Sequence, residues 1–485
     1  MPTSYIQSII KKYNIIILCF IILTCKKEPS IEYNLMSNEA IEFWLTDPNN
    51  NIKFLKQSDG FKLGQIDNQD LQTITINSNS IYQTIDGFGF ALTGGSAFHI
   101  FNLSTEKRSQ LLTELFDTTN NNIGISYLRI SIGSSDLDRY VFSYNDLDPG
   151  EIDPELNNFT IEEDKKYLIP VLKEILEIIP NIKILASPWS PPPWMKTNNN
   201  SIGGSLKPEF YGAYANYFIK YINHMADEGI NIDAITIQNE PLHPYNNPSL
   251  LMLPEEQTDF IKNHLGPSFL NNNINTKIII YDHNADQIDY PISILNDEEA
   301  REYIDGSAFH LYGGDINNLN SLHIAHPDKN LYFTEQWISA QGNFSEDLKW
   351  HARNLLIGAS RNWCKTIIEW NLAADENQEP YTPGGCSECL GAITISNDNY
   401  NKNTGFYLIA HIAKYVRPGS KRVYSTTSLK LPNVSFLRND NKLVIIVLND
   451  SNSKTYFNIK HGSFYMNSEL SAGALGTYVW DYELK

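Results

Sequence analysis

The chain has 485 residues and a formal net charge of −19. That length exceeds one ordinary domain and suits a barrel of about 250 residues with an accessory domain. Hydrophobic residues make up 42% of the chain, so it can bury a large core and does not belong to the disordered class. The acidity, with no long run of Lys or Arg, argues against nucleic acid or anionic lipid headgroups as partners.

The first residues predict export. Lys11 and Lys12 precede a short apolar run over residues 13–23, which is the pattern of a secretory signal and is too short for a membrane span. The run ends in Thr24-Cys25, which resembles a bacterial lipobox, in which the Cys is acylated. Thr24 departs from that pattern, since Gly, Ala or Ser usually precedes the Cys.

We therefore expect a lipoprotein-type signal over residues 1–25, lipidation of Cys25 and a tether over residues 26–37. The protein is then a lipoprotein of a bacterial outer membrane or cell surface, held to the membrane only by this anchor. Two alternatives stay open. An ordinary signal peptide gives a periplasmic or secreted protein, and an uncut signal remains as an anchor.

The middle of the chain alternates short apolar segments with helical stretches. Eight segments have the near-continuous apolar character of strands buried on both faces: 84–91, 127–132, 182–187, 234–239, 277–283, 307–312, 331–335 and 366–370. Their alternation with helices predicts parallel β-α-β units. We therefore predict an α/β fold with a closed eightfold β/α barrel (a TIM barrel) over residues 81–416.

One predicted helix illustrates this unit. Pro208 suits a first helical turn, where its missing N–H costs nothing, and Gly229 suits the end of the helix. The strand predicted from residue 234 follows directly. A helix that leads at once into a buried strand is the repeating unit of the barrel.

The two flanks of this region have another pattern. Residues 38–80 and 417–485 contain short alternating segments separated by Asn, Asp, Gly and Ser. Asn439-Asp440-Asn441 has the composition of a hairpin turn. We predict that the two chain ends pair into one accessory β-sandwich.

Two glutamates lie where a barrel enzyme places its active site, at the C-terminal ends of strands. Glu240 follows Asn239 at the end of the fourth predicted strand, and Glu335 ends the seventh. A retaining glycosidase needs two carboxyls about 5–5.5 Å apart, one as acid and one as nucleophile. Arg129, in the second strand, is a candidate partner for Glu335. A single buried Glu is commonly structural, but the joint position of these two favours catalysis.

The cysteines raise a different possibility. Cys386 and Cys389 have the C-x-x-C spacing of metal sites and redox pairs. Zinc needs about four ligands, and no second C-x-x-C accompanies this one. We therefore expect no metal and either a local disulfide or two thiols, and leave open whether Cys364 bonds to either.

Several motifs together are similar to one known family. They are Gly87-Phe88-Gly89, Leu128-Arg129-Ile130, Ser187-Pro188-Trp189, Ser205-Leu206-Lys207, Asn239-Glu240-Pro241, His310-Leu311-Tyr312, Glu335 and Glu369-Trp370-Asn371. In their order and spacing, residues 83–423 resemble glycoside hydrolase family 30, the family of lysosomal glucosylceramidase and microbial β-1,6-glucanases. The Asn-Glu-Pro motif alone is weakly specific for this family. The two tryptophan motifs, Ser187-Pro188-Trp189 and Glu369-Trp370-Asn371, together with Ser205-Leu206-Lys207, are strongly specific.

The resemblance implies roles for these residues and no metal or organic cofactor. Glu240 matches the acid/base and Glu335 the nucleophile. The residues that match or adjoin the family's sugar site, and are expected to bind substrate, are Arg129, Trp189, Asn239, His310, Tyr312, Trp370 and Asn371. Trp337 is a further candidate and, like Trp194, either stacks on a sugar face or packs the barrel rim.

Two departures bear on the substrate. Gly94 stands in place of an Asp that the resemblance assigns to the terminal glucose of glucosylceramide, and we expect its absence to open the site for a glucan chain. No Arg lies between Arg361 and Arg417, which disfavours glucuronoxylan. The predicted substrate is therefore β-1,6-glucan first, then glucosylceramide or a simple β-glucoside. The rival hypotheses are a non-catalytic glycan-binding lipoprotein and a C-x-x-C redox or metal protein.

Overall fold

The computed structural model describes residues 41–63 and 71–483. The predicted signal peptide, the tether and Cys25 lie outside these residues. Within the described ranges, no helix combines the length and the apolar character needed to cross a membrane.

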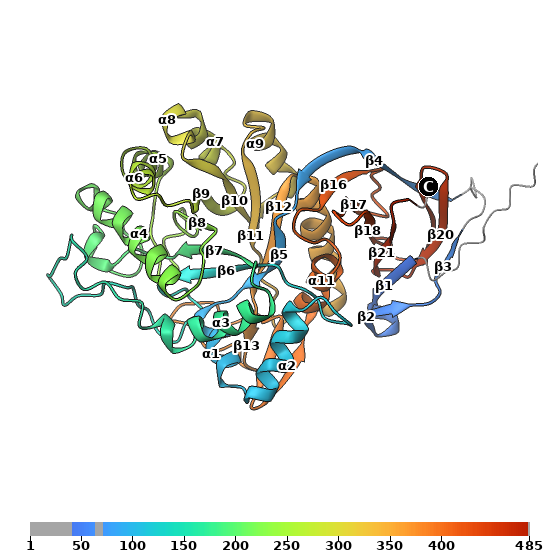
Figure 1. Cartoon of the computed structure of the whole chain (residues 1–485), viewed down its shortest axis with the longest axis horizontal. Helices are drawn as coiled ribbons and strands as arrows, with labels where there is room; N and C mark the ends of the chain where they lie inside the picture. The colour runs from blue at the N-terminus through green and yellow to red at the C-terminus, as the bar shows by residue number, and fades with distance from the viewer. Residues whose placement is uncertain (1–40, 64–70, 484–485) are drawn as a thin grey trace, which may run out of the picture. The chain divides into compact units, whose positions relative to one another are not determined.

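Eight parallel strands close into a barrel in the order β10-β11-β12-β5-β6-β7-β8-β9. Figure 1 shows these strands together, with helices around them. The barrel strands are β5 (Gly87–Ala91), β6 (Tyr127–Ile132), β7 (Lys183–Pro188), β8 (Ala234–Thr236), β9 (Lys277–Ala285), β10 (Ile304–Gly314), β11 (Asn330–Glu335) and β12 (Cys364–Asn371). Each lies within or overlaps one of the eight predicted segments. The predicted barrel is therefore confirmed.

The barrel interior is a packed core and not a channel. One buried cluster fills its centre with a side chain from most of the strands. Its members are Tyr127, Leu185, Ala234, Ile279, Ala308, Tyr332 and Ile368. This layer gives the site above it a rigid floor.

Helices and turns connect the strands. The α-helices are α1 (Gly94–Asn102), α2 (Thr105–Phe116), α3 (Leu168–Ile178), α4 (Tyr211–Asp227), α5 (Pro254–Phe260), α6 (Gly266–Asn271), α7 (Asp289–Asn296), α8 (Glu298–Arg301), α9 (Leu319–Ala325), α10 (Phe344–His351) and α11 (Thr404–Ala413). The shorter 3-10 and π segments are η2 (Pro48–Asn50), η3 (Asp164–Lys166), η4 (Pro193–Met195), η5 (Pro208–Phe210), η6 (Ile261–Leu265), η7 (Ile316–Asn318) and η8 (Ala352–Ala359). Gly229 follows α4 with φ of 82°, a conformation that suits glycine at a helix end.

The two chain ends form the accessory domain together. A ten-stranded sheet has the order β2-β1-β21-β18-β17-β16-β4-β19-β20-β3. Its strands are β1 (Ile41–Asp47), β2 (Ile52–Gln57), β3 (Phe61–Leu63), β4 (Gln72–Thr84), β16 (Lys421–Ser425), β17 (Asn433–Leu437), β18 (Lys442–Leu448), β19 (Thr455–His461), β20 (Phe464–Leu470) and β21 (Leu475–Asp481). A separate small sheet follows the barrel, made of β13 (Ala373–Ala374), β14 (Ile393–Ser396) and β15 (Asn399–Lys402).

Polar contacts join the accessory domain to the barrel. In α11, buried His411 has Thr477 Oγ1 at 2.9 Å from Nδ1 and Thr46 Oγ1 at 2.8 Å from Nε2. In η8, Arg353 donates twice to Asp450 at 2.5 Å. Strands from both ends of the chain therefore support the same side of the barrel.

Candidate active site

A cavity of about 460 Å³ opens at the C-terminal ends of the barrel strands. The predicted residues that line it are Trp189, Asn239, Glu240, Tyr312, Glu335, Trp337 and Trp370. The lining residues outside the predicted set are Asp136, His243, Asn246, His283, Asn284, Gly384, Gly385, Cys386 and Cys389. The cavity therefore combines predicted residues at strand ends with loop residues that the sequence did not assign to a sugar site.

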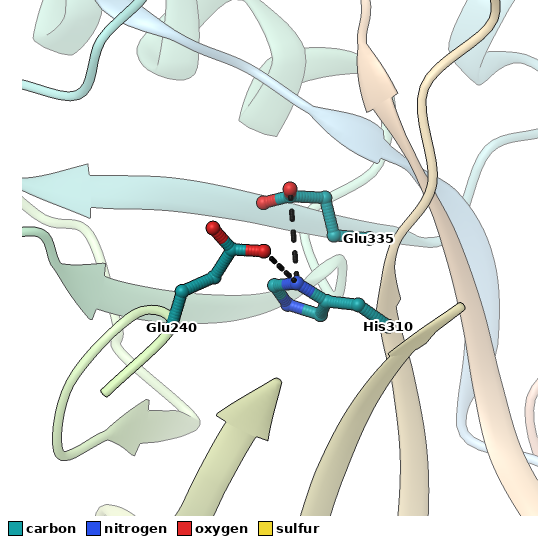
Figure 2. Close-up of side chains that lie close together, drawn as sticks. All are labelled: Glu240, His310 and Glu335. Atoms are coloured by element: carbon teal, nitrogen blue, oxygen red, sulfur yellow. Dashed lines mark hydrogen bonds and ion pairs between the residues drawn. The ribbon is translucent and has the colours of Figure 1, made fainter. Parts of the chain in front are cut away.

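The two glutamates face each other across this cavity. Figure 2 shows Glu240 and Glu335 directed toward one another with His310 below them. One oxygen of each carboxylate and one ring nitrogen of His310 all lie within 4.8 Å of one another. Glu240 itself has φ of 46°, an uncommon backbone conformation for a non-glycine residue and one found often at functional sites.

Arg129 organises the floor. Its guanidinium, which has no exposed surface, donates to Glu335 Oε2 at 2.5 Å, to Asn239 Oδ1 at 2.7 Å and to Asp282 Oδ2 at 2.8 Å. The same group lies 4.9 Å from the ring centre of Trp189 and 5.7 Å from that of Trp370. Arg129 thus acts as the predicted partner of Glu335 and lies behind the cavity wall.

Asp282, in strand β9, is the second charged residue of the floor. Its carboxylate accepts hydrogen bonds from Thr236 Oγ1 at 2.8 Å and Thr334 Oγ1 at 2.6 Å, besides the bond from Arg129. Burial raises the pKa of Asp282, but the Arg129 charge and the contact with His310 outweigh burial and hold the pKa far below its usual range. Asp282 is therefore a fixed negative charge beneath the two glutamates.

His310 connects Asp282 to the catalytic pair. Its Nε2 lies 3.1 Å from Asp282 Oδ1, and its Nδ1 lies 3.2 Å from Glu240 Oε1 and 3.8 Å from Glu335 Oε1. Burial lowers the pKa of His310, but the surrounding carboxylates outweigh burial and raise it to about 9. The imidazole is therefore protonated at neutral pH in the resting site.

The pKa values of the two glutamates follow from this charge. Burial raises the pKa of Glu240, but the hydrogen bond and charge of His310 bring it below its usual value. Burial raises the pKa of Glu335 above its usual value, although His310 and Arg129 act against it. Because Glu240, His310 and Glu335 are in contact, they titrate as one set.

The remaining predicted residues differ in position. Tyr312 donates from its hydroxyl to Glu335 Oε1 at 2.9 Å, which gives this carboxylate a second donor. The rings of Trp189 and Trp370 stack at 5.4 Å between centroids and form one wall. Trp337 lines the rim, whereas Trp194 is buried against Phe210 and donates to Asn145.

Asn371, like Arg129 and His310, is a predicted residue that lies behind the cavity lining. Its Oδ1 accepts from Ser96 Oγ at 2.8 Å, and its Nδ2 donates to the carbonyl of Cys389 at 3.4 Å. It does not line the cavity. Its contacts position the loop that follows β12.

The expectation for Gly94 is wrong. A Cβ added to Gly94 would lie 1.6 Å from Asp138 Oδ1, so a buried carboxylate occupies the space of the missing side chain. Gly94 does not line the cavity, and the site is not opened there. The carboxylate of Asp136, two residues before Asp138, lines the cavity instead.

The sequence did not indicate Asp136 as a site residue, because no catalytic or binding motif surrounds it. Burial and the charge of Glu335 raise the pKa of Asp136 to about 7. Its Oδ2 accepts the backbone N–H of Cys386 at 3.2 Å. Asp136 is therefore a third carboxyl of the cavity, apart from the Arg129 network.

A cation would have to compete with protein donors in this site. Glu240, His310 and Glu335 could in principle share a metal ion, since their ligand atoms lie within 4.8 Å of one another. Arg129 already donates to Glu335, and protonated His310 lies among the three groups. Two positive charges at this place disfavour a divalent cation.

Comparisons with known proteins agree with this architecture. The glycosyl hydrolase family 30 TIM-barrel domain matches residues 85–416, and the family 30 β-sandwich domain matches residues 419–478. An endo-1,6-β-D-glucanase of Aspergillus fumigatus is 33% identical over 72% of this chain and 73% of its own length. The lysosomal acid glucosylceramidase of Mus musculus is 30% identical over 84% of this chain and 83% of its own length.

Solved structures give the same picture. The structure of an endo-β1,6-glucanase has a TM-score of 0.84 and 34% identity, covering 91% of this chain and 99% of that one. Xylanases of family 30 are similar at 21% identity or less with TM-scores of 0.61–0.69, which shows the fold alone. The matches to both domains, together with the two facing glutamates, show that this chain belongs to glycoside hydrolase family 30 and is a glycosidase.

Proposed function

We propose that this enzyme cleaves β-1,6-glucan by two-step hydrolysis with retention of anomeric configuration. The observation that carries the mechanism is the separation of the two carboxylates, whose nearest oxygens lie within 4.8 Å. Retaining glycosidases place their carboxyls about 5–5.5 Å apart, whereas inverting enzymes leave about 6.5–9.5 Å for a water molecule. The space between Glu240 and Glu335 is therefore suited to covalent catalysis.

In the first step, Glu335 attacks the anomeric carbon and the bond to the leaving oxygen breaks. Arg129 and Tyr312 donate to the two oxygens of Glu335, which favours its ionised form at neutral pH and orients it for attack. Glu240 protonates the leaving oxygen in the same step. In the second step, Glu240 takes a proton from water, which attacks the glycosyl-enzyme and releases the sugar.

His310 supplies the acid with its proton. Its protonated Nδ1 donates toward Glu240 Oε1 across 3.2 Å. Transfer of this proton gives a neutral imidazole and a carboxylic acid, and a neutral imidazole no longer lowers the pKa of Glu240. Asp282 accepts from the opposite ring nitrogen and so fixes the orientation of the ring, with Nδ1 facing Glu240. The chemistry is complete with these groups and assigns no step to a metal or organic cofactor.

The choice of β-1,6-glucan rests on relatives. The endo-1,6-β-D-glucanase of Aspergillus fumigatus and the solved endo-β1,6-glucanase share at least 33% of their aligned residues with this chain. Glucosylceramide or a simple β-glucoside is the alternative substrate, favoured by the mouse glucosylceramidase as a relative. A non-catalytic glycan-binding protein is disfavoured, because it would not need both carboxylates with their donors in place.

The leaving sugar departs on the Glu240 side of the cavity, because Glu240 protonates its oxygen. The loop after Glu240 contributes His243 and Asn246 to the cavity lining on that side. Thr382 Oγ1 donates to the carbonyl of Asn247 at 2.5 Å, and Asn247 Nδ2 donates to the carbonyl of Pro383 at 3.0 Å. A surface fixed in this way is suited to hold further sugar units of a chain.

We also propose export with a lipid anchor on Cys25, on the strength of the N-terminal sequence alone. Mass spectrometry of the protein purified from a bacterial membrane fraction tests this. A diacylated or triacylated Cys25 at the new N-terminus supports it. A free N-terminus elsewhere, in soluble protein, contradicts the anchor without affecting the catalytic proposal.

The catalytic proposal is tested with the protein lacking residues 1–25. It is incubated with β-1,6-glucan, β-1,3-glucan, xylan, glucosylceramide and an aryl β-glucoside, and products are separated by size. Oligosaccharides of the β-anomer from β-1,6-glucan, seen by NMR before mutarotation, are the expected result. Glucose from the ceramide or aryl glucoside alone supports the alternative substrate, and an α-anomer contradicts retention.

A further inference from the structure

We propose that the Cys386–Cys389 disulfide is a positioning element of the sugar site, which holds the loop of residues 381–390 so that Asp136 and the Trp337 loop keep their places. This inference rests on the proposed function of the cavity. It assigns no chemical step to the sulfur atoms. The disulfide acts through the residues that the loop contacts.

The disulfide forms part of the cavity wall. Cys386 and Cys389 are bonded to each other, and both line the cavity together with Gly384 and Gly385. The stretch between β13 and β14 that contains them has no helix or strand of its own. The bond closes a short turn of residues 386–389, so it fixes the shape of that turn, from which backbone and side-chain contacts reach the neighbouring segments.

One side of the loop holds Asp136. The backbone N–H of Cys386 donates to Asp136 Oδ2 at 3.2 Å, and the N–H of Thr382 donates to the carbonyl of Asp136 at 2.8 Å. A Cβ added to Gly385 would lie 2.5 Å from that carbonyl oxygen, so the approach requires glycine. The loop thus fixes both the main chain and the side chain of this cavity carboxyl.

The other side of the loop holds the segment after the nucleophile. Ala340 N donates to the carbonyl of Glu388 at 2.8 Å, and Leu390 N donates to the carbonyl of Ile338 at 2.9 Å. Ser339 and Cys389 form an isolated antiparallel bridge between these bonds. Trp337 therefore belongs to a segment paired with the disulfide loop.

The sulfur atoms also lie against the aromatic wall. Cys389 is 3% exposed and belongs to the buried cluster of Trp189 and Trp370. Cys386 and Trp337 pack against the same cluster. The disulfide thus contacts three sides of the sugar site, while Glu240, Glu335 and Arg129 are held by the barrel floor. Loss of the disulfide should accordingly weaken substrate binding more than the chemical step.

The experiment uses the protein lacking residues 1–25 with the substitution Cys364→Ala. This substitution removes the buried free cysteine, so thiol measurements report on Cys386 and Cys389 alone. In this background, the Cys386→Ser/Cys389→Ser variant is compared with its disulfide-bonded parent on β-1,6-glucan and on an aryl β-glucoside. We expect KM to rise about 5- to 20-fold and kcat to fall by less than about threefold, the pattern of lost binding and not of lost chemistry.

A second measurement tests the same proposal without the double-cysteine variant, in case that variant folds poorly. The parent is reduced with a phosphine, which is oxidised while the S–S bond becomes two thiols, and thiol titration confirms two new groups per chain. The KM increase should appear on reduction and reverse on reoxidation. Asp136→Asn should raise KM as well, and the effect of reduction should be at least about threefold smaller in that variant, because the loop acts partly through Asp136.

The outcomes separate this inference from the proposed function. A parent that is inactive on every substrate contradicts the function itself. An active parent whose KM is unchanged after complete reduction overturns the positioning role alone. An equal loss of kcat, in proportion to the unfolded fraction seen by circular dichroism, overturns it as well, because that result assigns the disulfide to stability only.

Discussion

The floor and the rim of the active site are built in different ways. The floor lies on strand ends, and its charges are buried and paired: Arg129 bonds to Asp282 and Glu335 without any exposed surface on the guanidinium. The rim lies on loops, and its residues are held by backbone hydrogen bonds and one disulfide. We expect the floor to perform the reaction common to the family and the rim to select the glycan that reaches it.

The largest expected effect is at the floor. Glu335→Gln keeps the shape of the side chain but removes the nucleophile, so kcat on β-1,6-glucan should fall by about 10⁴-fold or more with folding intact. The control is Glu174→Gln, which alters only a surface pair with Arg108. A folded Glu335→Gln enzyme at full rate would falsify the nucleophile assignment.

Removal of the central cation should affect stability as well as rate. Arg129→Met leaves Asp282 and Glu335 buried without their partner, and loss of one member of a buried ion set costs about 3–5 kcal/mol of unfolding free energy. Urea denaturation followed by tryptophan fluorescence measures it. Lys173→Met, at an exposed pair with Glu228, should cost far less, because water screens the charges of such a pair. Equal losses in the two variants would contradict the distinction between floor and surface charges.

The charge on His310 predicts a pH dependence. Its pKa is raised from 6.5 to about 9 in the folded protein, so the folded state binds the proton more tightly than the unfolded state. The stabilisation is complete below about pH 6.5 and is lost as pH rises to about 9, with an upper limit of about 3 kcal/mol. The difference in unfolding free energy between wild type and His310→Gln should therefore decrease over that range. A difference that does not change with pH speaks against a protonated His310.

The smallest effect is expected at the rim. His243→Ala removes a side chain from the leaving-group wall, so KM for β-1,6-glucan should rise about 3- to 10-fold. The change in KM for an aryl β-glucoside, which has no sugar on that side, should be smaller. Equal changes in KM on both substrates would contradict a role of His243 in binding the leaving sugar, and with it the distinction between floor and rim.

The same contrast separates what the sequence predicted from what it did not. The barrel follows from eight apolar segments with helices between them, and β6 is buried at every position. Glu240, Glu335 and Arg129 were predictable because strand ends converge in a barrel, whatever the loops do. The Cys386–Cys389 bond was one of two predicted alternatives, and the structure confirms the disulfide.

The rim was not predictable from local patterns. Asp136 reaches the cavity through a loop whose path depends on contacts with residues 382 and 386, far away in the chain. Gly94 was misjudged for the same reason, since only the fold brings Asp138 into the space of its missing side chain. Long-range packing, and not residue type, decides both cases.

The pairing of the two chain ends has a consequence for the order in which the protein is made. Strand β1 pairs with β21, with Ile41 opposite Trp480, so the first described strand meets this partner only after more than 430 further residues have been made. At a synthesis rate of about 5–20 residues per second, the edge of β1 that binds β21 stays without this partner for roughly 20 to 90 seconds. An unpaired edge is a template for association, and lysines on it oppose that. Strand β2, at the end of the ten-stranded sheet, carries exposed Lys53 and Lys56, two positive charges that disfavour association through this edge while β1 waits for its partner.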